Sequence, residues 1–275
     1  MQRLNDERFK PSGIELFLKR DDLINPEIPG NKWRKLVYNL AAAQKEQHST
    51  LLTFGGAYSN HIRATAAAGY YHGMTTIGVI RGEEHKPLND SLQQAVNYGM
   101  RLVYIDRTTY RHKTDLAFIN GLHEKFGDFY LLPEGGSNSL AVRGCAEIVA
   151  ELDEPFDVIA SACGTGATLA GIASALSPHQ RALGFSALKG GTFLNDAVSA
   201  FHDRSLSNWS IETRYHFGGF ARRTPRLDAF IADFYARHEI ALEWVYVAKM
   251  MYGLFDLAAQ GSLPAGSRVL AVVTG

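Results

Sequence analysis

Short apolar runs, each followed by a turn and a helix-like stretch, recur along the chain and restrict its fold more than any other feature. Helix-like stretches lie near residues 88–98 and 108–126, for example. The apolar runs occupy residues 51–54, 75–80, 101–105, 157–162, 182–188 and 268–273. Strands that alternate with helices form parallel sheets with helices on both faces. The sequence therefore predicts an α/β fold with twisted parallel sheets.

The glycine-rich turns predict one shared binding cleft. Right-handed crossovers place every turn that follows a strand at the carboxyl edge of its sheet, where open α/β sheets bind ligands. Three such turns carry polar residues, and PEGGSNS (133–139) marks a return between two lobes. We predict a smaller inserted lobe over residues 46–136 and a larger lobe over residues 1–45 and 137–275.

Composition excludes several classes of protein. Lys plus Arg equals Asp plus Glu, at 28 each, so no bulk charge attracts nucleic acid or an anionic membrane. Apolar stretches fall short of the roughly 20 residues that span a bilayer, and the first residues lack the apolar core of a secretory signal. Two cysteines, Cys145 and Cys163, are too few for a disulfide framework. We expect a cytoplasmic protein with reduced thiols and, without HExxH or CxxC motifs, no metal.

The GNKWRKL motif, residues 30–36, contains a lysine suited to covalent chemistry. Gly30 permits a tight turn, Asn31 is a good N-cap, and an amphipathic helix follows. Lys32 therefore lies in the first helical turn, where the helix dipole and any burial lower its pKa from the reference value of about 10.4. A lysine that is neutral part of the time can form a Schiff base. The alternative is a solvated lysine that merely follows a cap.

The GGAYSNH motif, residues 55–61, places polar side chains where a strand leads into a helix. The two glycines allow a sharp turn, and Ser59 or Asn60 can cap the helix. The opening N–H groups of that helix form an anion site suited to a substrate carboxylate. His61, near the helix N-terminus, is expected to be neutral. The alternative is that Ser59 is only a cap and His61 only a surface residue.

The CGTGATLAG motif, residues 163–171, predicts a phosphate cradle. A strand, a Gly-x-Gly turn with threonines and a helix start come together there, and such turns bind terminal phosphates. The motif is not a nucleotide P-loop, because no Gly-Lys-Ser/Thr follows. It is not a dinucleotide fingerprint either, because Leu169 stands where a third glycine would be. Tyr246 can stack on an aromatic ligand or pack in the core at a helix start.

Together these segments resemble the 1-aminocyclopropane-1-carboxylate deaminase and D-cysteine desulfhydrase family, within the tryptophan-synthase-β-like group of pyridoxal 5'-phosphate (PLP) enzymes. The motifs with counterparts in that family are KRDD (19–22), GNKWRKL (30–36), GGAYSNH (55–61), PEGGSN (133–138), CGTGAT (163–168), VYVAK (245–249) and VVTG (272–275). The combination of GNKxRKL with a downstream SNH is the specific part. The resemblance implies a two-lobe fold with the cofactor between the lobes, a homodimer, and a small amino acid as substrate.

The resemblance also implies roles for individual residues. The catalytic set is Lys32, which holds the cofactor covalently and later acts as the base, with Ser59 and Tyr246, which lies against the cofactor ring. The substrate carboxylate is received by Ser59, Asn60 and His61. Asn60 also bonds the phenolic oxygen of the cofactor, and Lys35 reaches its phosphate. The rest of the phosphate site is the turn formed by Gly164, Thr165, Gly166, Ala167 and Thr168.

Three positions depart from the deaminase pattern of that family. Deaminases place a glutamate directly after the tyrosine of the VY pair, where it protonates the pyridine nitrogen, and this chain has Val247. Desulfhydrases present a threonine hydroxyl to that nitrogen from an HTGG-like motif near the C-terminus. Thr274 occupies that place, with Val273 instead of the usual histidine. Phe220 replaces a second tyrosine that the deaminases use.

These departures favour one reaction of the family. A hydroxyl partner leaves the ring nitrogen closer to neutral than a carboxylate does, which favours expulsion of a β-leaving group over a long-lived carbanion. The sequence therefore predicts β-elimination of the D-cysteine desulfhydrase type, with pyruvate, ammonia and sulfide as products. The alternative within the family is 1-aminocyclopropane-1-carboxylate deaminase, which yields 2-oxobutanoate and ammonia. The alternative from another class is a catalytically idle PLP-binding or regulatory protein, suggested by Val247, Phe220 and a chain that ends at Gly275.

Overall fold

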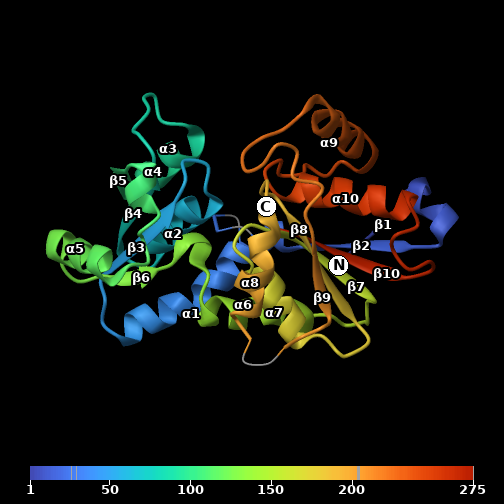
Figure 1. The fold of residues 1–275 in the computed structure, drawn as a ribbon, viewed down its shortest axis with the longest axis horizontal. Coiled ribbons are helices and arrows are strands. Elements are labelled where there is room, and N and C mark those ends of the chain that lie inside the picture. The colour runs from blue at the N-terminus through green and yellow to red at the C-terminus, as the bar shows by residue number, and fades with distance from the viewer. Residues whose placement is uncertain (26, 29, 203–204, 275) are drawn as a thin grey trace. The chain divides into compact units, whose positions relative to one another are not determined.

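The chain divides into two compact units. The computed structural model describes residues 1–25, 27–28, 30–202 and 205–274, so the last residue of the VVTG motif, Gly275, lies outside the described residues. The first unit comprises Met1–Asn25, Pro29–Asn31 and Val142–Gly275. The second comprises Pro26–Ile28 and Lys32–Ala141. Each unit is a sheet with helices on both of its faces (Figure 1), which confirms the predicted α/β fold.

The first unit contains a six-stranded sheet over the described residues, in the order β1-β2-β10-β7-β8-β9. Its strands are β1 (Gln2–Leu4), β2 (Glu15–Arg20), β7 (Val158–Cys163), β8 (Arg181–Ser186), β9 (Trp209–Glu212) and β10 (Arg268–Val273). Strand β1 pairs antiparallel with β2, and the other neighbours are parallel. Strands β7, β8 and β10 lie where apolar runs predicted them.

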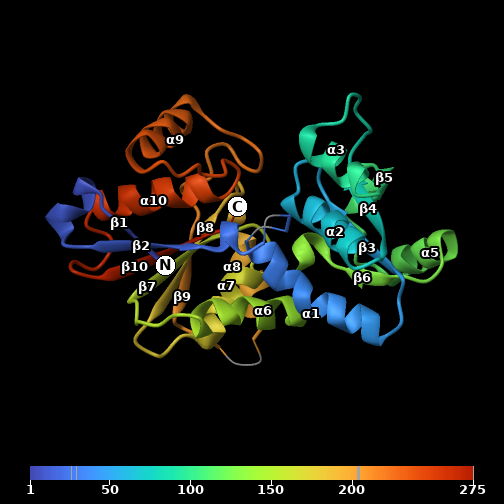
Figure 2. The same ribbon diagram turned by 180° about the vertical axis from the view of Figure 1, so that it is seen from behind.

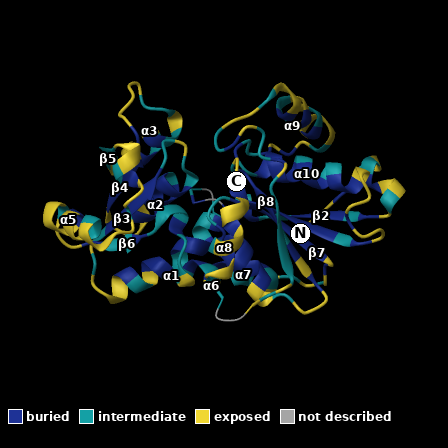
Figure 3. Cartoon of the chain, in the orientation of Figure 1, coloured by how far each residue is buried: buried dark blue, intermediate teal, exposed yellow. Residues whose placement is uncertain are grey.

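Helices cover both faces of this sheet (Figures 1 and 2). One face carries η1 (Glu7–Ser12), α9 (Pro225–His238) and α10 (Val247–Ala259), and the other carries α6 (Ser139–Ala150), α7 (Ala167–Ala175) and α8 (Leu194–Ser199). Strand β7 is buried along its whole length, as Figure 3 shows for the centre of the sheet. A central parallel strand is covered on both faces, so its sequence is a continuous apolar run. Short 3-10 helices η2 (Asp21–Leu23) and η4 (Gly191–Phe193) follow β2 and β8.

The second unit contains a parallel sheet in the order β5-β4-β3-β6. Its strands are β3 (Thr50–Gly55), β4 (Thr75–Arg81), β5 (Arg101–Ile105) and β6 (Tyr130–Leu132), and the 3-10 helix η3 (Glu134–Gly136) follows β6. One face packs against α1 (Asn31–Lys45), α2 (Asn60–Tyr71) and α3 (Asp90–Asn97), and the other against α4 (Arg107–Tyr110) and α5 (Leu116–Phe126). Over the described residues, no helix has the length and apolar character that crossing a membrane requires.

Helix α1 explains why the second unit begins earlier than the predicted boundary at residue 46. Leu36, Leu40 and Ala43 are buried in one cluster with Leu51 of β3 and Leu132 of β6. Burial of apolar surface is the main favourable term in folding, so the helix belongs to the sheet that covers its apolar side. The predicted single helix over residues 108–126 is also divided, into α4 and α5.

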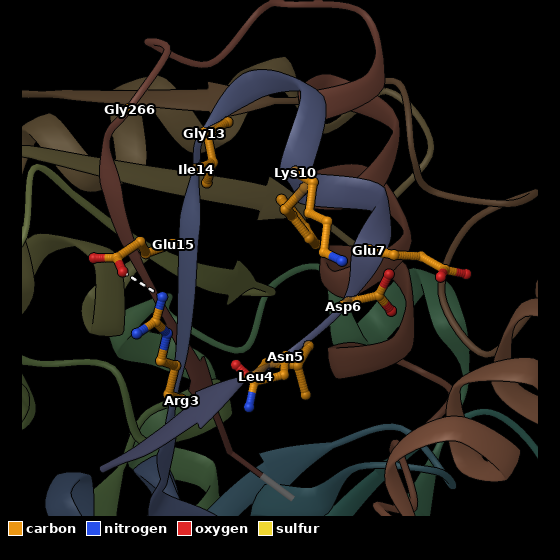
Figure 4. Close-up of a pocket in the computed structure, with 11 residues that line it drawn as sticks. Arg3, Leu4, Asn5, Asp6, Glu7, Lys10, Gly13, Ile14, Glu15 and Gly266 are labelled. Carbon is orange, nitrogen blue, oxygen red and sulfur yellow. Dashed lines mark ion pairs between the residues drawn. The ribbon is translucent and has the colours of Figure 1, made fainter.

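A cavity of about 610 Å³ opens in the first unit beside β1 and η1 (Figure 4). Its lining includes Ile14, just before β2, and Gly266, shortly before β10. The figure shows the ion pair between Arg3 and Glu15 at one side of it. The cavity therefore lies at the amino edge of the parallel strands, whereas ligands of open α/β sheets bind at the carboxyl edge.

An ion network beside this cavity ties the start of the chain to α9. The carboxylate of Asp6 accepts hydrogen bonds from Arg8 (Nε at 2.8 Å) and His238 (Nε2 at 2.9 Å), and Arg8 Nη1 lies 2.8 Å from Asp233. Burial alone would raise the pKa of Asp6. The hydrogen bonds from Arg8 and His238 outweigh burial and hold this pKa well below its usual range.

We expect this network to make the fold sensitive to acid. A carboxyl group with a depressed folded-state pKa stabilises the fold above its unfolded-state pKa of about 3.9, and this contribution is lost as the pH falls through the folded-state value. Urea unfolding of the wild type should show the free energy of unfolding falling steeply below pH 4. The Asp6→Asn variant should show a flatter profile, and Asp90→Asn, at an exposed position of α3, should match the wild type. Identical profiles for all three proteins would contradict this prediction.

Candidate functional site

Two predicted cofactor segments lie at the carboxyl edge of the first sheet. The turn Gly164–Thr168 follows β7, and Thr274 follows β10. Strands β7 and β10 are parallel neighbours, in register from Val158–Val269 to Ala160–Ala271. Residues that follow neighbouring parallel strands share one edge of the sheet. The structure therefore brings these two segments together.

Close packing requires both glycines of the Gly164–Thr168 turn. A Cβ at Gly164 would lie 2.9 Å from Cε1 of Tyr246, and one at Gly166 would lie 2.9 Å from Val198. Gly166 also has φ 88°, a conformation that favours glycine. Helix α7 begins at Ala167 without a side-chain cap, so its first N–H groups point out of the helix end. A phosphate fits this arrangement, because the helix dipole and the N–H groups that open a helix both favour an anion.

Thr168 connects this turn to the start of α1. The side-chain nitrogen of Asn31 donates a hydrogen bond of 2.8 Å to the Thr168 hydroxyl, and both residues are buried. The sulfur of Cys145 lies 3.8 Å from the same oxygen. Asn31 is the first residue of α1, and half-buried Lys32 is the second. The covalent neighbour of the predicted cofactor lysine is therefore fixed to the predicted phosphate turn.

Gly30 packs against the end of β10. Its φ is 63°, and a Cβ there would lie 1.7 Å from the carbonyl oxygen of Thr274. Its N–H donates to the carbonyl oxygen of Asp21 at 2.9 Å. Thr274 itself is buried, with 5% of its surface exposed. Only glycine allows the backbone to pass this close to Thr274.

Tyr246 stands at the start of α10, where a carboxylate holds the backbone. Oε1 of Glu243 accepts from the Val245 N–H at 2.6 Å, and Oε2 accepts from the Tyr246 N–H at 2.8 Å. Burial raises the pKa of Glu243, although these backbone hydrogen bonds oppose the rise. The ring of Tyr246 packs edge to face with Phe220 at 6.0 Å between centroids. Tyr246 is thus a half-buried ring beside the Gly164 backbone.

The polar residues predicted to bind substrate lie at the start of α2 in the second unit. Ser59 is the N-cap, and its hydroxyl accepts from the Ile62 N–H at 3.4 Å. Asn60 is the first residue of the helix, and both side chains are half-buried. The preceding Gly55 is required, because a Cβ there would lie 2.5 Å from Ile62 and 2.9 Å from Ser59. The helix start is therefore positioned as the sequence predicts.

His61 is a buried residue, so the interpretation of it as a surface residue is wrong. Only 1% of its surface is exposed, and Nε2 lies 2.8 Å from the Thr53 hydroxyl. That hydroxyl donates to the carbonyl of Leu132 at 3.0 Å, so Nε2 of His61 must carry the proton. Burial lowers the pKa of His61 well below its ordinary value, with further lowering from the nearby Lys32 and Lys35. The histidine is therefore neutral, as predicted.

Lys35 anchors the turn that carries the PEGGSN motif. Its ammonium group donates to the carbonyl oxygen of Gly135 at 3.2 Å and to the hydroxyl of Ser137 at 3.3 Å. The side chain is buried, with 2% of the residue exposed. These partners all belong to the second unit. The role of Lys35 at the cofactor phosphate stays a prediction.

The first unit and the start of α1 thus assemble a set of residues that fits PLP. The Gly164–Thr168 turn suits the phosphate, and Tyr246 offers a ring to the planar pyridine. Thr274 follows β10 at the same carboxyl edge of the sheet. Sequence reasoning missed Glu243 and Thr53, which hold Tyr246 and His61 in place. Glu243 accepts from the N–H groups two and three residues ahead, as an N-cap does, but glutamate is not among the preferred capping residues, so its sequence signal is weak. Thr53, inside an apolar strand, gives no comparable signal.

Known proteins with similar sequences and structures agree with this interpretation. Residues 3–275 match the family model described as pyridoxal-phosphate dependent enzyme. A putative 1-aminocyclopropane-1-carboxylate deaminase from Pyrococcus horikoshii is 30% identical, over 96% of this chain and 85% of the relative. The bifunctional D-cysteine desulfhydrase/1-aminocyclopropane-1-carboxylate deaminase of Arabidopsis thaliana is also 30% identical, over 96% and 73%.

A solved structure extends the similarity to the whole fold. The crystal structure of a 1-aminocyclopropane-1-carboxylate deaminase homologue superposes with a TM-score of 0.83 at 27% sequence identity, covering 100% of this chain and 88% of the other. The matched family depends on the same cofactor that the Gly164–Thr168 turn and Tyr246 fit. The chain therefore belongs to the pyridoxal-phosphate-dependent enzymes, in the family of 1-aminocyclopropane-1-carboxylate deaminases and D-cysteine desulfhydrases.

Proposed function

We propose that this enzyme carries out β-elimination on a small amino acid, of the D-cysteine desulfhydrase type, and releases pyruvate, ammonia and sulfide. The observation that carries the proposal is Val247. This residue is fully buried in the core at the first position of α10, directly after Tyr246. Deaminases of the family place a glutamate there, and a valine can neither donate nor accept a proton. Thr274 supplies a hydroxyl at the end of β10 instead.

Residues of the first unit hold the cofactor in this proposal. The backbone N–H groups of the Gly164–Thr168 turn would bind the phosphate, Tyr246 would lie against the ring, and the Thr274 hydroxyl would bond the ring nitrogen. When bound, PLP supplies an electron sink that stabilises negative charge at the α-carbon of the substrate. The hydroxyl of Thr274 is uncharged, so it leaves the ring nitrogen closer to neutral than a glutamate would.

Lys32 holds the cofactor and then moves a proton. With PLP bound, Lys32 would hold the cofactor, and its side chain, once released, would take the α-proton of the substrate. Support comes from the position of Lys32 directly after Asn31, which the Thr168 hydroxyl fixes. Ser59 and Asn60 receive the substrate carboxylate at the N-terminus of α2, where the helix dipole favours an anion. Buried His61, the second residue of this helix, connects it to β3 through a hydrogen bond with Thr53.

The purified enzyme should release sulfide, pyruvate and ammonia in equal amounts from D-cysteine. The Thr274→Val variant replaces the hydroxyl with a methyl group, and we expect turnover to fall about 10- to 100-fold because a buried polar partner is lost. Thr274→Ser keeps the hydroxyl and should retain most of the activity. Initial rates of sulfide and pyruvate release measure all three proteins. Equal rates for the valine and serine variants would remove Thr274 from the proposal.

The deaminase reaction is the second candidate, favoured by the names of two similar proteins. It predicts release of 2-oxobutanoate and ammonia from 1-aminocyclopropane-1-carboxylate. Ring opening needs a stronger electron sink and additional acid–base groups than loss of a thiolate does. We expect the specificity constant kcat/KM for the cyclopropane substrate to be at least about 100-fold below that for D-cysteine. The reverse order would make the deaminase reaction the function of this enzyme.

We further propose a cytoplasmic homodimer, on the strength of the family resemblance. Light scattering during size-exclusion chromatography should give a mass twice that of one 30.3 kDa chain. A mass equal to one chain would contradict the dimer and leave the proposed reaction untouched.

A further inference from the structure

Lys249 is a buried cation that none of the roles above uses. It lies in the first turns of α10 with 1% of its surface exposed, and its ammonium group donates a hydrogen bond of 2.8 Å to the carbonyl oxygen of Gly219. Burial lowers the pKa of Lys249 to about 8, while the Glu243 carboxylate acts in the opposite direction. A charge in an apolar core costs free energy, and the hydrogen bond to Gly219 offsets part of that cost.

The partner of Lys249 belongs to a strained turn over residues 216–222. Phe217 and Ala221 both have φ 49°, in the left-handed region that disfavours side chains, and Gly218 and Gly219 have φ 93° and 114°. Within the turn, the Gly219 carbonyl oxygen also accepts the Arg222 N–H at 3.2 Å. Strained backbone of this kind persists only where the surrounding structure holds it. The bond from Lys249 supplies such support from outside the turn.

The turn carries two aromatic rings onto α10. Phe217 packs edge to face on Tyr252 at 5.0 Å between centroids, and Phe220 packs on Tyr246 at 6.0 Å. Tyr246 in turn lies beside the Gly164 backbone. A continuous set of contacts therefore leads from the Lys249 ammonium through Gly219 and Phe220 to the ring of Tyr246.

We propose that Lys249 is a positioning residue, whose bond to Gly219 holds the 216–222 turn so that Phe220 forms a wall against Tyr246 at the cofactor and substrate site. This inference rests on the proposed function, which assigns Tyr246 to the cofactor ring. Without the bond, the strained turn relaxes and Phe220 leaves Tyr246. The site then admits substrate less well, while the groups that move protons stay in place.

Limited proteolysis of the holoenzyme tests the bond without any substrate. Arg222 and Arg223 are exposed at the end of the turn, so trypsin can report its opening at these two residues. In the Lys249→Met variant we expect cleavage after Arg222 and Arg223 to be about tenfold faster, because one charge-assisted hydrogen bond is lost. The melting temperature should change little, because methionine has a similar length and removal of a buried charge offsets loss of the hydrogen bond.

Lys189→Met is the matched control. Lys189 is exposed, and a Cβ at Gly219 would lie 3.4 Å from its Cβ, so this variant makes the same substitution at an exposed lysine beside the same turn. Its cleavage rate should equal that of the wild type. Unchanged cleavage in Lys249→Met would overturn the proposal. A lower melting temperature with cleavage throughout the chain, or loss of the folded protein, would also overturn it, since Lys249 would then support the whole core.

Kinetics test whether the bond acts through Phe220. We expect Lys249→Met and Phe220→Ala to raise KM for D-cysteine by about the same factor with a smaller effect on kcat, and the double variant to show no further rise. Additive increases in KM in the double variant would show that Lys249 does not act through Phe220. If the wild type does not turn over D-cysteine, the proposed function fails, while the cleavage rates still decide whether Lys249 holds the turn.

Discussion

Lys32→Ala is expected to abolish turnover of every amino-acid substrate, with kcat falling by at least about 10³-fold. Two roles are lost together, because the same side chain holds the cofactor and takes the α-proton. The variant should still bind PLP through the Gly164–Thr168 turn, since the backbone N–H groups there do not depend on the lysine. The absorption band of the Schiff base should therefore be replaced by that of the free aldehyde, while equilibrium dialysis still detects bound PLP.

Lys45→Ala provides the control for this experiment. Lys45 is exposed at the last position of the same helix. Its replacement should leave kcat, KM and the visible spectrum unchanged. Near-normal activity in Lys32→Ala would mean that another residue holds the cofactor, and both the assignment of Lys32 and the proposed mechanism would have to be abandoned.

Gly30→Ala should cost about 4 kcal/mol or more of folding free energy, or prevent folding, because the new methyl group meets backbone. Its Cβ would lie 1.7 Å from the Thr274 carbonyl oxygen and 2.6 Å from the Thr274 Cα. Neither atom can rotate away as a flexible side chain could. The start of α1 or the end of β10 must move, and either shift displaces a residue assigned to the cofactor. Urea unfolding measures the free-energy loss.

Gly73→Ala separates this steric clash from the strain of the backbone conformation. Gly73 has φ 66°, close to the 63° of Gly30, yet a Cβ there would have nothing within 4 Å. Its replacement should lower the free energy of unfolding by only about 1 to 2 kcal/mol, because alanine disfavours a left-handed conformation by about that amount. Similar losses in both variants would show that the approach of Gly30 to Thr274 is not the reason for the glycine.

Much of the fold could be predicted because parallel strands are buried on both faces. Their sequences are continuous apolar runs, as in VIASAC of β7, and glycine turns end them clearly. Strand β2 was not predicted, because ELFLKR has charged residues at both ends and its apolar run, Leu16 to Leu18, is only three residues long. Helix α9 was not predicted either, although its N-terminus carries a sequence signal. Thr224 caps it and Pro225 occupies its first turn.

The helix predicted over residues 108–126 shows the opposite error. Asp106 accepts hydrogen bonds from the Thr108 and Thr109 N–H groups and begins α4, while Asp115 precedes a second helix. Each aspartate is a common residue at helix starts, so two of them nine positions apart favour two short helices over one. Apolar periodicity alone conceals such a break.

The candidate site was predictable where a motif is local and unpredictable where it depends on tertiary contacts. Ser59 caps its helix as expected, because the cap and its N–H partner are three residues apart. The bond between Asn31 and Thr168 joins residues 137 positions apart, and the contact of Gly30 with Thr274 spans nearly the whole chain. No pattern along the sequence records such distances. The same holds for Lys249, which reads as an ordinary helix residue until its burial is known.

The division of α1 between the two units restricts how this enzyme could be recombined with its relatives. Asn31 belongs to the first unit and Lys32 to the second, although both lie in one helix. A chimera that exchanged the second unit at this junction would take the lysine from one parent and its anchoring asparagine from the other. A crossover placed after α1 would keep the pair together but would transplant a sheet without the helix that covers it. A folded and active chimera therefore needs parents that match both at the Asn31–Thr168 hydrogen bond and at the contact of α1 with the second sheet.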